Sequence, residues 1–184
     1  MSRKKRPEFP GAEASVDVAT MIRVDHAGEY GAVRIYEGQL AVLGARSSPA
    51  AAAVRHMAEQ EKRHLEAFDS LIVGRRVRPT ALEPVWRMAG FALGAASALL
   101  GEKAAMACTA AVEDVIDKHY ASQIARLGDT DPQLSNTIEE FRAEEISHRD
   151  TAISHDAEGA PAYRLLSESI KAGCRLAIAL SEKI

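Results

Sequence analysis

The sequence has little cysteine, few aromatic residues and almost no net charge. Only two cysteines occur among 184 residues, and aromatic residues make up 5%. Cys108 and Cys174 form no CxxC pair, which excludes a thiolate zinc knuckle and a dithiol redox pair. We therefore expect two buried, reduced thiols. A formal net charge of −3 argues against a nucleic-acid partner. Abundant alanine favours close-packed helices over a β-sandwich.

A secretory signal and a membrane-spanning run are also missing. The first residues, MSRKKRP, are basic, but no apolar segment follows them. We predict a disordered basic tail over residues 1–14, which is either simply solvated or weakly attracted to anionic lipid. The longest nearly apolar stretch has fourteen uncharged residues, from Met88 to Gly101. A membrane-spanning helix needs about 20.

Glycine and proline residues divide the rest of the chain into helices. Gly44, Gly74 and Gly128 are suitable helix ends, while Pro49 and Pro132 are suitable first helical residues. No segment has a convincing strand pattern. We predict one domain over residues 15–184 with helices at about 15–43, 49–73, 82–100, 102–127, 132–157 and from about 162 to the C-terminus.

The strongest signal is a Glu-x-x-His motif that occurs twice. Residues 61–64 read EKRH and residues 145–148 read EISH, 84 positions later. The same offset relates Glu29 to Glu113, so each half has a glutamate followed 32 residues later by Glu-x-x-His. Further matches at this offset are Tyr36 with Tyr120, Gln39 with Gln123, and Leu43 with Leu127. Such agreement predicts an internal repeat of a helical hairpin.

Helix geometry places the repeated residues at one level of a bundle. Three residues along a helix rotate by about 300° and rise by about 4.5 Å, so the Glu and His of each motif share a face. The two legs of each hairpin are of similar length between the single glutamate and the motif, roughly 12 to 15 residues. Two facing hairpins therefore bring together Glu29, Glu61, His64, Glu113, Glu145 and His148.

That set of side chains predicts a dimetal site. Four carboxylates and two imidazoles buried without a cation would cost many kcal/mol in desolvation and repulsion. Carboxylate-rich sites with one nitrogen per ion suit iron or manganese better than structural zinc. The pattern is that of ferritin-like di-iron carboxylate proteins. We therefore predict an all-α, ferritin-like four-helix bundle built from two repeated hairpins, plus two accessory helices. An accidental gathering on a polar helix surface is the alternative.

Several residues near the motifs are further candidates for the site. Tyr36 and Tyr120 are either core tyrosines with bonded hydroxyls or redox or gating residues near the metals. Asp25 is either a hydrogen-bond acceptor for a ligand histidine or an ordinary helix carboxylate. His119 is a further candidate near the site, and His26 is a candidate core histidine. We expect solvated positions for Glu59, Lys62, Arg63, Glu66, Glu140 and Glu144.

The uncharged segment over residues 84–101 has two interpretations. It is either a buried crossover helix between the hairpins or a helix whose apolar face meets lipid or an apolar substrate. The preceding basic residues Arg75, Arg76 and Arg78 would suit anionic headgroups. Small residues, including Gly90 and Gly94, allow close helix packing.

Several stretches resemble the demethoxyubiquinone hydroxylases of ubiquinone biosynthesis, and the resemblance covers nearly the whole chain from Asp17 onward. RVDHAGEYGAVRIYEGQ at 23–39 is the most specific stretch. The others are QEKRHL at 60–65, AMACTAAVED at 105–114, FRAEEISHRD at 141–150 and the C-terminal IKAGCRLAIALSEKI.

The resemblance implies a ferritin-like di-iron monooxygenase that uses O₂ to hydroxylate the ring of a polyprenyl demethoxyubiquinone. It implies two iron ions held by the six residues named above. NADH is linked to the family as reductant, but no GxGxxG follows a strand here, so the quinol itself is an alternative electron source. The resemblance also implies a peripheral membrane protein with a lipid-binding accessory partner. We expect the cytoplasmic side of a bacterial cell membrane, and dimerisation through an apolar patch is a further alternative.

Three rival functions remain open at this level. A ferritin-like peroxide-scavenging or iron-handling protein would keep the same ligands but need no long uncharged helix. A di-iron hydroxylase acting on RNA is disfavoured by the acidic net charge. A metal-free scaffold or quinone carrier would leave the buried carboxylates unpaired.

Overall fold

The computed structural model describes residues 12–184, and this part of the chain is helical with no strand. Six α-helices and one 3₁₀-helix follow one another along it. Their bounds are α1 Ala12–Leu43, α2 Pro49–Gly74, α3 Glu83–Leu99, α4 Glu102–Leu127, α5 Pro132–Ser154, η1 Ala157–Gly159 and α6 Tyr163–Ser181. The all-α prediction is confirmed.

Two helix ends differ from the sequence prediction. α1 begins at Ala12, three residues before the expected start, because alanine and glutamate at 12–14 are good helix formers that extend it. The rest of the predicted tail, residues 1–11, lies outside the described residues. α5 ends at Ser154 instead of near Ala157 because Asp156 adopts the left-handed conformation, with φ 62°, which ends an α-helix.

Proline and capping residues fix the starts of two helices of the bundle. Pro49 and Pro132 occupy the first turns of α2 and α5 as expected. The Ser48 side chain accepts from the backbone N–H of Ala51, and Asp131 accepts from that of Leu134. Arg75, just after α2, forms an ion pair with the same Asp131. The end of the first hairpin is thereby tied to the start of α5.

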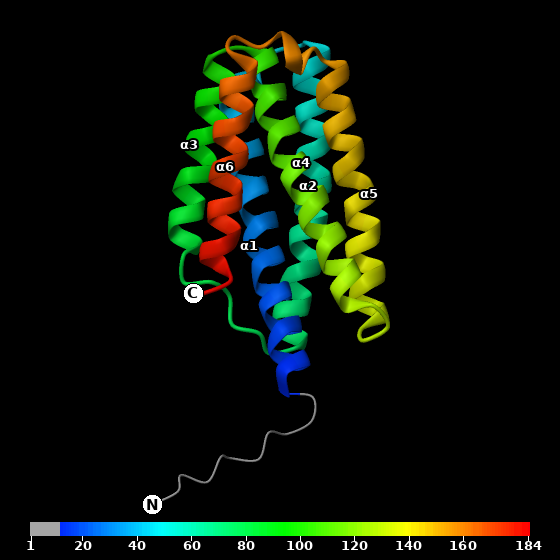
Figure 1. The fold of residues 1–184 in the computed structure, drawn as a ribbon. Helices are drawn as coiled ribbons and strands as arrows, with labels where there is room; N and C mark the ends of the chain where they lie inside the picture. The colour runs from blue at the N-terminus through cyan, green and yellow to red at the C-terminus, as the bar shows by residue number, and fades with distance from the viewer. Residues whose placement is uncertain (1–11) are drawn as a thin grey trace, which may run out of the picture.

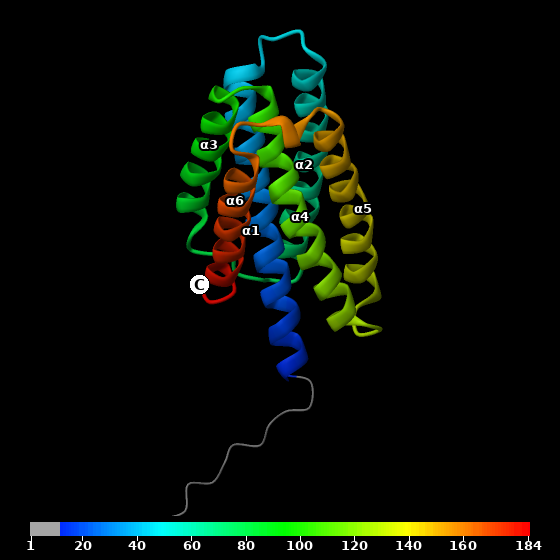
Figure 2. The same cartoon turned by 45° about the horizontal axis from the view of Figure 1, so that its top comes forward.

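Two helical hairpins pack against each other as the repeat predicted (Figure 1). α1 packs on α2, and α4 packs on α5, while α1 and α2 each contact α4 across the bundle. The α1–α2 loop and the α5–α6 connection lie at the same end of the molecule (Figure 2). Buried side chains from all four helices fill the space between the hairpins, among them Tyr36, Met57, Phe68, Tyr120 and Leu134.

The accessory helices α3 and α6 cover one side of the bundle, α3 mainly against α1 and α6 mainly against α4. α3 approaches α1 so closely that a β-carbon on Gly94 would overlap the carbonyl oxygen of Ile35. One face of α3 is buried by this contact. The opposite face is exposed, with Met88 at 76% and Leu99 at 75%. The fully buried crossover helix is therefore ruled out.

Candidate metal centre

All six predicted ligands meet in the middle of the bundle. Glu29 comes from α1, Glu61 and His64 from α2, Glu113 from α4, and Glu145 and His148 from α5. Each is at most 2% exposed. They form two overlapping groups whose candidate ligand atoms lie within 4.8 Å of one another. The first is Glu29, Glu61, His64 and Glu145, and the second is Glu61, Glu113, Glu145 and His148.

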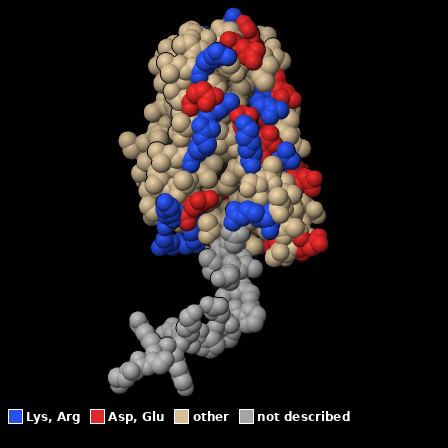
Figure 3. Space-filling view, in the orientation of Figure 1, with Lys and Arg blue, Asp and Glu red and all other residues tan. Residues whose placement is uncertain are grey.

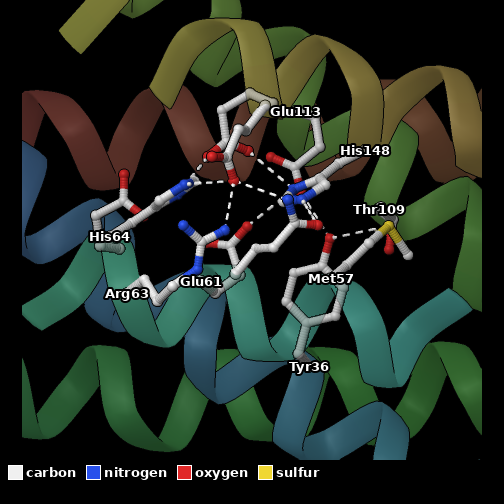
Figure 4. A network of polar contacts seen from close by, with 12 residues as sticks. Tyr36, Met57, Glu61, Arg63, His64, Thr109, Glu113 and His148 are labelled. Carbon is white, nitrogen blue, oxygen red and sulfur yellow. Dashed lines mark hydrogen bonds and ion pairs between the residues drawn. The ribbon is translucent and has the colours of Figure 1, made fainter. Parts of the chain in front are cut away.

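The two histidines turn the same ring nitrogen toward the carboxylates (Figure 4). His64 Nδ1 lies 3.0 Å from Glu145 Oε1 and 3.5 Å from Glu29 Oε2. His148 Nδ1 lies 3.0 Å from Glu61 Oε1 and 3.4 Å from Glu145 Oε2. Glu61 and Glu145 belong to both groups, which suits carboxylates that bridge two ions.

The atoms that converge here are ones that lack hydrogen bonds. Among the described residues, buried atoms without a partner include both oxygens of Glu61 and Glu145, one oxygen of Glu29 and Glu113, and Nδ1 of both histidines. Buried polar atoms are ordinarily hydrogen-bonded, and exceptions need an explanation. Two cations at the centre of the cluster would satisfy all eight atoms, so the residues present fit a dimetal site.

The electrostatics of the cluster support the same conclusion. Burial raises the pKa of Glu61 and Glu113 well above the ordinary carboxyl range, and it also raises the pKa of Glu145. Burial alone would lower the pKa of His64, but Glu145 and Glu29 outweigh it and raise that pKa to about 11. Without a cation these groups must hold protons between them. A divalent cation can replace those protons.

Each of the two repeat-related tyrosines bonds a glutamate of the other hairpin. The Tyr36 hydroxyl donates to Glu113 Oε1 at 3.0 Å, and the Tyr120 hydroxyl donates to Glu29 Oε1. Both rings are buried, at 2% and 1% exposed. The interpretation as core tyrosines with bonded hydroxyls is confirmed. Their partners are candidate ligands, so both hydroxyls also help to orient the site.

Asp25 and His119 lie farther out than the sequence suggested. Asp25 Oδ1 is 3.1 Å from His119 Nε2 and accepts a 2.7 Å hydrogen bond from Gln123. The alternative in which Asp25 bonds a ligand histidine is not what the structure has: Oδ1 bonds His119 and Gln123 on α4, and the buried Oδ2 has no hydrogen-bond partner. His26 is buried as expected; its Nε2 lies 2.9 Å from Asp69, while its buried Nδ1 has no hydrogen-bond partner.

Sequence reasoning missed the groups behind the two ligand histidines. Glu144 was expected on a solvated face, but its side chain is only 22% exposed and its Oε2 lies 3.2 Å from His64 Nε2. Gln60 Oε1 lies 3.2 Å from His148 Nε2. Gln60 and Glu144 are themselves 84 positions apart, so the repeat offset would have revealed the pair. The other residues expected to be solvated are exposed: Glu59, Lys62, Arg63, Glu66 and Glu140.

An apolar cavity of about 570 Å³ lies between the accessory helices α3 and α6 and the bundle helices α1 and α4, and none of the six candidate ligands lines it. α1 and α4 contribute residues that adjoin the candidate ligands, such as Gly28 beside Glu29 and Val112 beside Glu113. Trp86 of α3 and Gly173 of α6 line its outer part. Both cysteines are free, with Cys108 buried and Cys174 half-buried at the cavity wall. This volume is typical of small-molecule sites.

The sequence is similar to proteins of one family along almost its entire length. Residues 16–181 match the family described as "Ubiquinone biosynthesis protein COQ7". The chain is 55% identical over 178 residues to a 3-demethoxyubiquinol 3-hydroxylase of Rhodospirillum rubrum, covering 97% of this chain and 82% of that protein. It is 53% identical over 177 residues to the human mitochondrial NADPH-dependent 3-demethoxyubiquinone 3-hydroxylase, covering 94% and 80%. A yeast 5-demethoxyubiquinone hydroxylase is 43% identical over 179 residues, covering 89% and 77%.

Proposed function

This chain belongs to the family of ubiquinone biosynthesis protein COQ7, and from that premise we propose that it is a di-iron monooxygenase. It hydroxylates the ring of a polyprenyl demethoxyubiquinone or its quinol in ubiquinone biosynthesis. The overall reaction consumes O₂, two electrons and two protons, places one oxygen atom on a ring carbon, and releases the other as water. The observation that carries this proposal is the buried six-residue cluster, in a bundle that also has an apolar cavity between α1, α4 and the accessory helices.

We assign two iron ions to the cluster, held by Glu29, Glu61, His64, Glu113, Glu145 and His148. One imidazole nitrogen per ion with carboxylate oxygens is a donor set suited to iron cycling between Fe²⁺ and Fe³⁺. When bound, the iron pair supplies the electrons and coordination positions for the reduction of O₂. The protein keeps this centre dry, because each ligand side chain is almost completely buried.

We place the substrate ring in the cavity, against the residues that neighbour Glu29 on α1 and Glu113 on α4 in the sequence. Its wall is built from small and aliphatic residues, which match a methylated quinone ring better than a charged substrate. Tyr36 and Tyr120 hold Glu113 and Glu29 through their hydroxyls, so the ligands nearest the cavity are fixed before substrate enters. The isoprenoid tail leaves between α3 and α6, along the exposed apolar side chains of α3.

We propose that the exposed apolar face of α3 rests on a membrane surface, at the cytoplasmic side of a bacterial cell. No helix among the described residues is long and apolar enough to cross a bilayer. Exposed apolar side chains instead lie along α3, including Met88 at 76%, and Leu176 of α6 is exposed at 60% on a helix that also carries charged residues. The edge of the molecule formed by α3 has few charges, and basic side chains gather near its lower end (Figure 3). Such a face suits peripheral binding to anionic lipid.

One part of the expected lipid contact needs correction. Arg75 is not available to headgroups, since it pairs with Asp131. Arg76 is exposed beside it, and Arg78 is exposed while bonding the carbonyl of Ile184. We expect wild-type protein to sediment with anionic vesicles and Met88→Asp to sediment less. Equal sedimentation of the two proteins would contradict membrane contact through α3.

An accessory protein, a second copy of the chain and the electron donor are further predictions. The same apolar face suits a lipid-binding accessory protein or a second copy of the chain. NADH or the quinol substrate is the proposed reductant, and the names of several mitochondrial relatives specify NADPH for those proteins.

The Glu113→Ala variant tests the assignment of the site. We expect wild-type protein reconstituted without oxygen to hold two irons per chain and to hydroxylate a short-tail demethoxyquinol. Glu113→Ala should lose iron and turnover together, whereas Glu140→Ala, at an exposed position on α5, should keep both. A fully active Glu113→Ala protein would refute the site. Two irons with rapid peroxide consumption and no ring product would instead favour the peroxide-scavenging rival.

A further inference from the structure

The inner residues of the site obey the internal repeat, but the residues behind them do not. Glu29 pairs with Glu113 at the repeat offset, and likewise each Glu-x-x-His motif has the same residue types in its mate. Behind the histidines the repeat-related positions hold Gln60 and Glu144. The centre therefore combines two equal inner sets of donors with one amide and one carboxylate behind them.

Gln60 and Glu144 join the two histidines in a continuous chain across α2 and α5. His64 Nε2 lies 3.2 Å from Glu144 Oε2, and His148 Nε2 lies 3.2 Å from Gln60 Oε1. Gln60 Nε2 donates to Glu144 Oε2 at 2.8 Å. Arg63, which is 58% exposed on its side chain, reaches the same oxygen at 3.1 Å. The chain thus runs His64–Glu144–Gln60–His148.

The hydrogen-bond directions in this chain are fixed by the carboxylate. An ionised carboxylate only accepts, so both His64 Nε2 and the Gln60 amide group must donate to Glu144. The Gln60 carbonyl oxygen is then left to accept from His148 Nε2. Both rings therefore carry their proton on the outer nitrogen. The inner Nδ1 lone pairs are directed at the candidate metal positions.

We propose that Gln60 and Glu144 are positioning residues that make the two metal positions unequal. A carboxylate behind a ligand histidine forms a charge-assisted hydrogen bond and makes the imidazole a stronger donor. His64 has such a partner, while His148 has only a neutral amide. The group of Glu29, Glu61, His64 and Glu145 is therefore the tighter position, which fills first. This inference rests on the dimetal site of the proposed function.

A second break in the repeat, at Asp25, has no hydrogen bond to the ligands. Asp25 stands at the position that corresponds to Thr109 in the second hairpin. The hydrogen bonds of Asp25 go to His119 and Gln123, not to any of the six ligands. The matching bond in the other half joins Gln39 to Thr109. A third break, Phe141 on α5 against Met57 on α2, touches His64 through ring stacking, with the ring centroids 4.1 Å apart. Gln60 and Glu144 are thus the unequal pair that hydrogen-bonds the two ligand histidines.

Stepwise metal binding tests this inequality without relying on turnover. The metal-free protein is titrated with Co²⁺ under anaerobic conditions, and visible absorption reports the two dissociation constants. We expect two separate steps for the wild type. Glu144→Gln should weaken the first step by about 10- to 100-fold and merge it with the second. Glu140→Gln, one helical turn earlier on the same helix, is the matched control and should leave both steps unchanged.

A double variant that exchanges Gln60 and Glu144 shows whether these residues set the metal affinity of the two positions or only support the structure. In the double variant Gln60→Glu with Glu144→Gln, the carboxylate moves behind His148, and the separation of the two steps should return. Proton NMR of singly loaded protein should show the shifted, exchangeable ring N–H of His64 in the wild type and that of His148 in the double variant. The signal that disappears in the His148→Ala variant is assigned to the ring N–H of His148.

The outcomes separate this inference from the proposed function. Two equal steps in the wild type, or an unchanged first step in Glu144→Gln, would overturn the inequality while leaving the dimetal site standing. Failure of the double variant to restore two steps, with its helical content intact by circular dichroism, would also overturn it. Wild-type protein that binds no metal would overturn both proposals.

Discussion

Tyr36 on α1 donates its hydroxyl proton to Glu113 on α4 at 3.0 Å, across 77 positions of sequence. Its repeat mate Tyr120 on α4 makes the reciprocal bond to Glu29 on α1. The two hairpins are therefore joined at the level of the candidate metal centre by a symmetric pair of bonds. Each bond ends on a glutamate that is a candidate metal ligand. These two hydrogen bonds join the hairpins and also hold candidate ligands. Removing one of them should therefore lower the stability of the fold and disturb the site.

Removing the Tyr36 hydroxyl tests that link. Tyr36→Phe leaves a buried oxygen of Glu113 without its donor, so we expect the metal-loaded protein to lose about 1–3 kcal/mol of unfolding free energy. Urea unfolding followed by circular dichroism measures the loss. Tyr30→Phe on the same helix, at a half-buried position, is the control and should change stability by less than about 0.5 kcal/mol. Equal stability of the two variants would show that the hydroxyl does not support the site.

Close packing of α3 on α1 predicts a sharp difference between two glycines. Gly94→Ala would place a methyl group onto the carbonyl oxygen of Ile35, and overpacking of this kind costs about 1–3 kcal/mol. Gly31→Ala has no atom within 4 Å of the added carbon and should gain up to about 1 kcal/mol from helix propensity. Thermal unfolding of both variants measures the two effects. A Gly94→Ala protein as stable as the wild type would mean that the helices separate without cost.

The buried carboxyl groups of the metal-free site should make a contribution to stability that decreases as pH rises. The folded pKa of Glu61 and Glu113 is raised above the unfolded value of 4.5, chiefly by burial. Their contribution to stability is therefore complete below that value and is lost as pH rises through the folded pKa. His64, raised from 6.5 to about 11, acts in the same direction at higher pH.

Metal binding displaces these protons, so added metal should stabilise the protein more at higher pH. We expect the difference in melting temperature with and without Fe²⁺, measured without oxygen, to grow steadily between about pH 5 and pH 8. A difference that stays constant over this range would contradict the assignment of the cations to the buried carboxylates.

Filling the cavity should impair substrate binding without removing metal. Gly173 lines the cavity on α6, and no atom lies within 4 Å of a β-carbon built there, so a leucine can enter the space. Gly173→Leu should raise the KM for a demethoxyquinol by about tenfold or more, with two irons retained. Ala172→Leu on the exposed neighbouring position is the control. An unchanged KM in Gly173→Leu would place the substrate elsewhere.

Much of the fold and the six candidate ligands could be predicted because both depend on short-range rules. Glycine and proline mark the helix ends, and an i, i+3 spacing places Glu61 beside His64 whatever the rest of the chain does. The repeat offset then brings in Glu29 and Glu113. These inferences need no knowledge of how far apart the helices lie.

What could not be predicted depends on contacts between helices. The partner of Asp25 is set by the position of α4, which brings His119 and Gln123 to it. Glu144 lies on α5 beside the face that holds Glu145 and His148. Whether its carboxylate contacts His64 or solvent depends on where α2 packs, which the sequence does not show. α5 ends at Ser154, shortly before Asp156, which adopts the left-handed conformation. Glycine is the usual residue for that conformation, so the sequence does not indicate this helix end.

The most direct test of the central claim is a single turnover with ¹⁸O₂. Protein loaded with two irons per chain and reduced is mixed with a short-tail demethoxyquinol, and the product is weighed by mass spectrometry. We predict one ¹⁸O atom in the hydroxylated ring, and none when Glu113→Ala replaces the wild type. A product without label, or oxygen consumed with no ring product, would contradict the account of this chain as a di-iron monooxygenase.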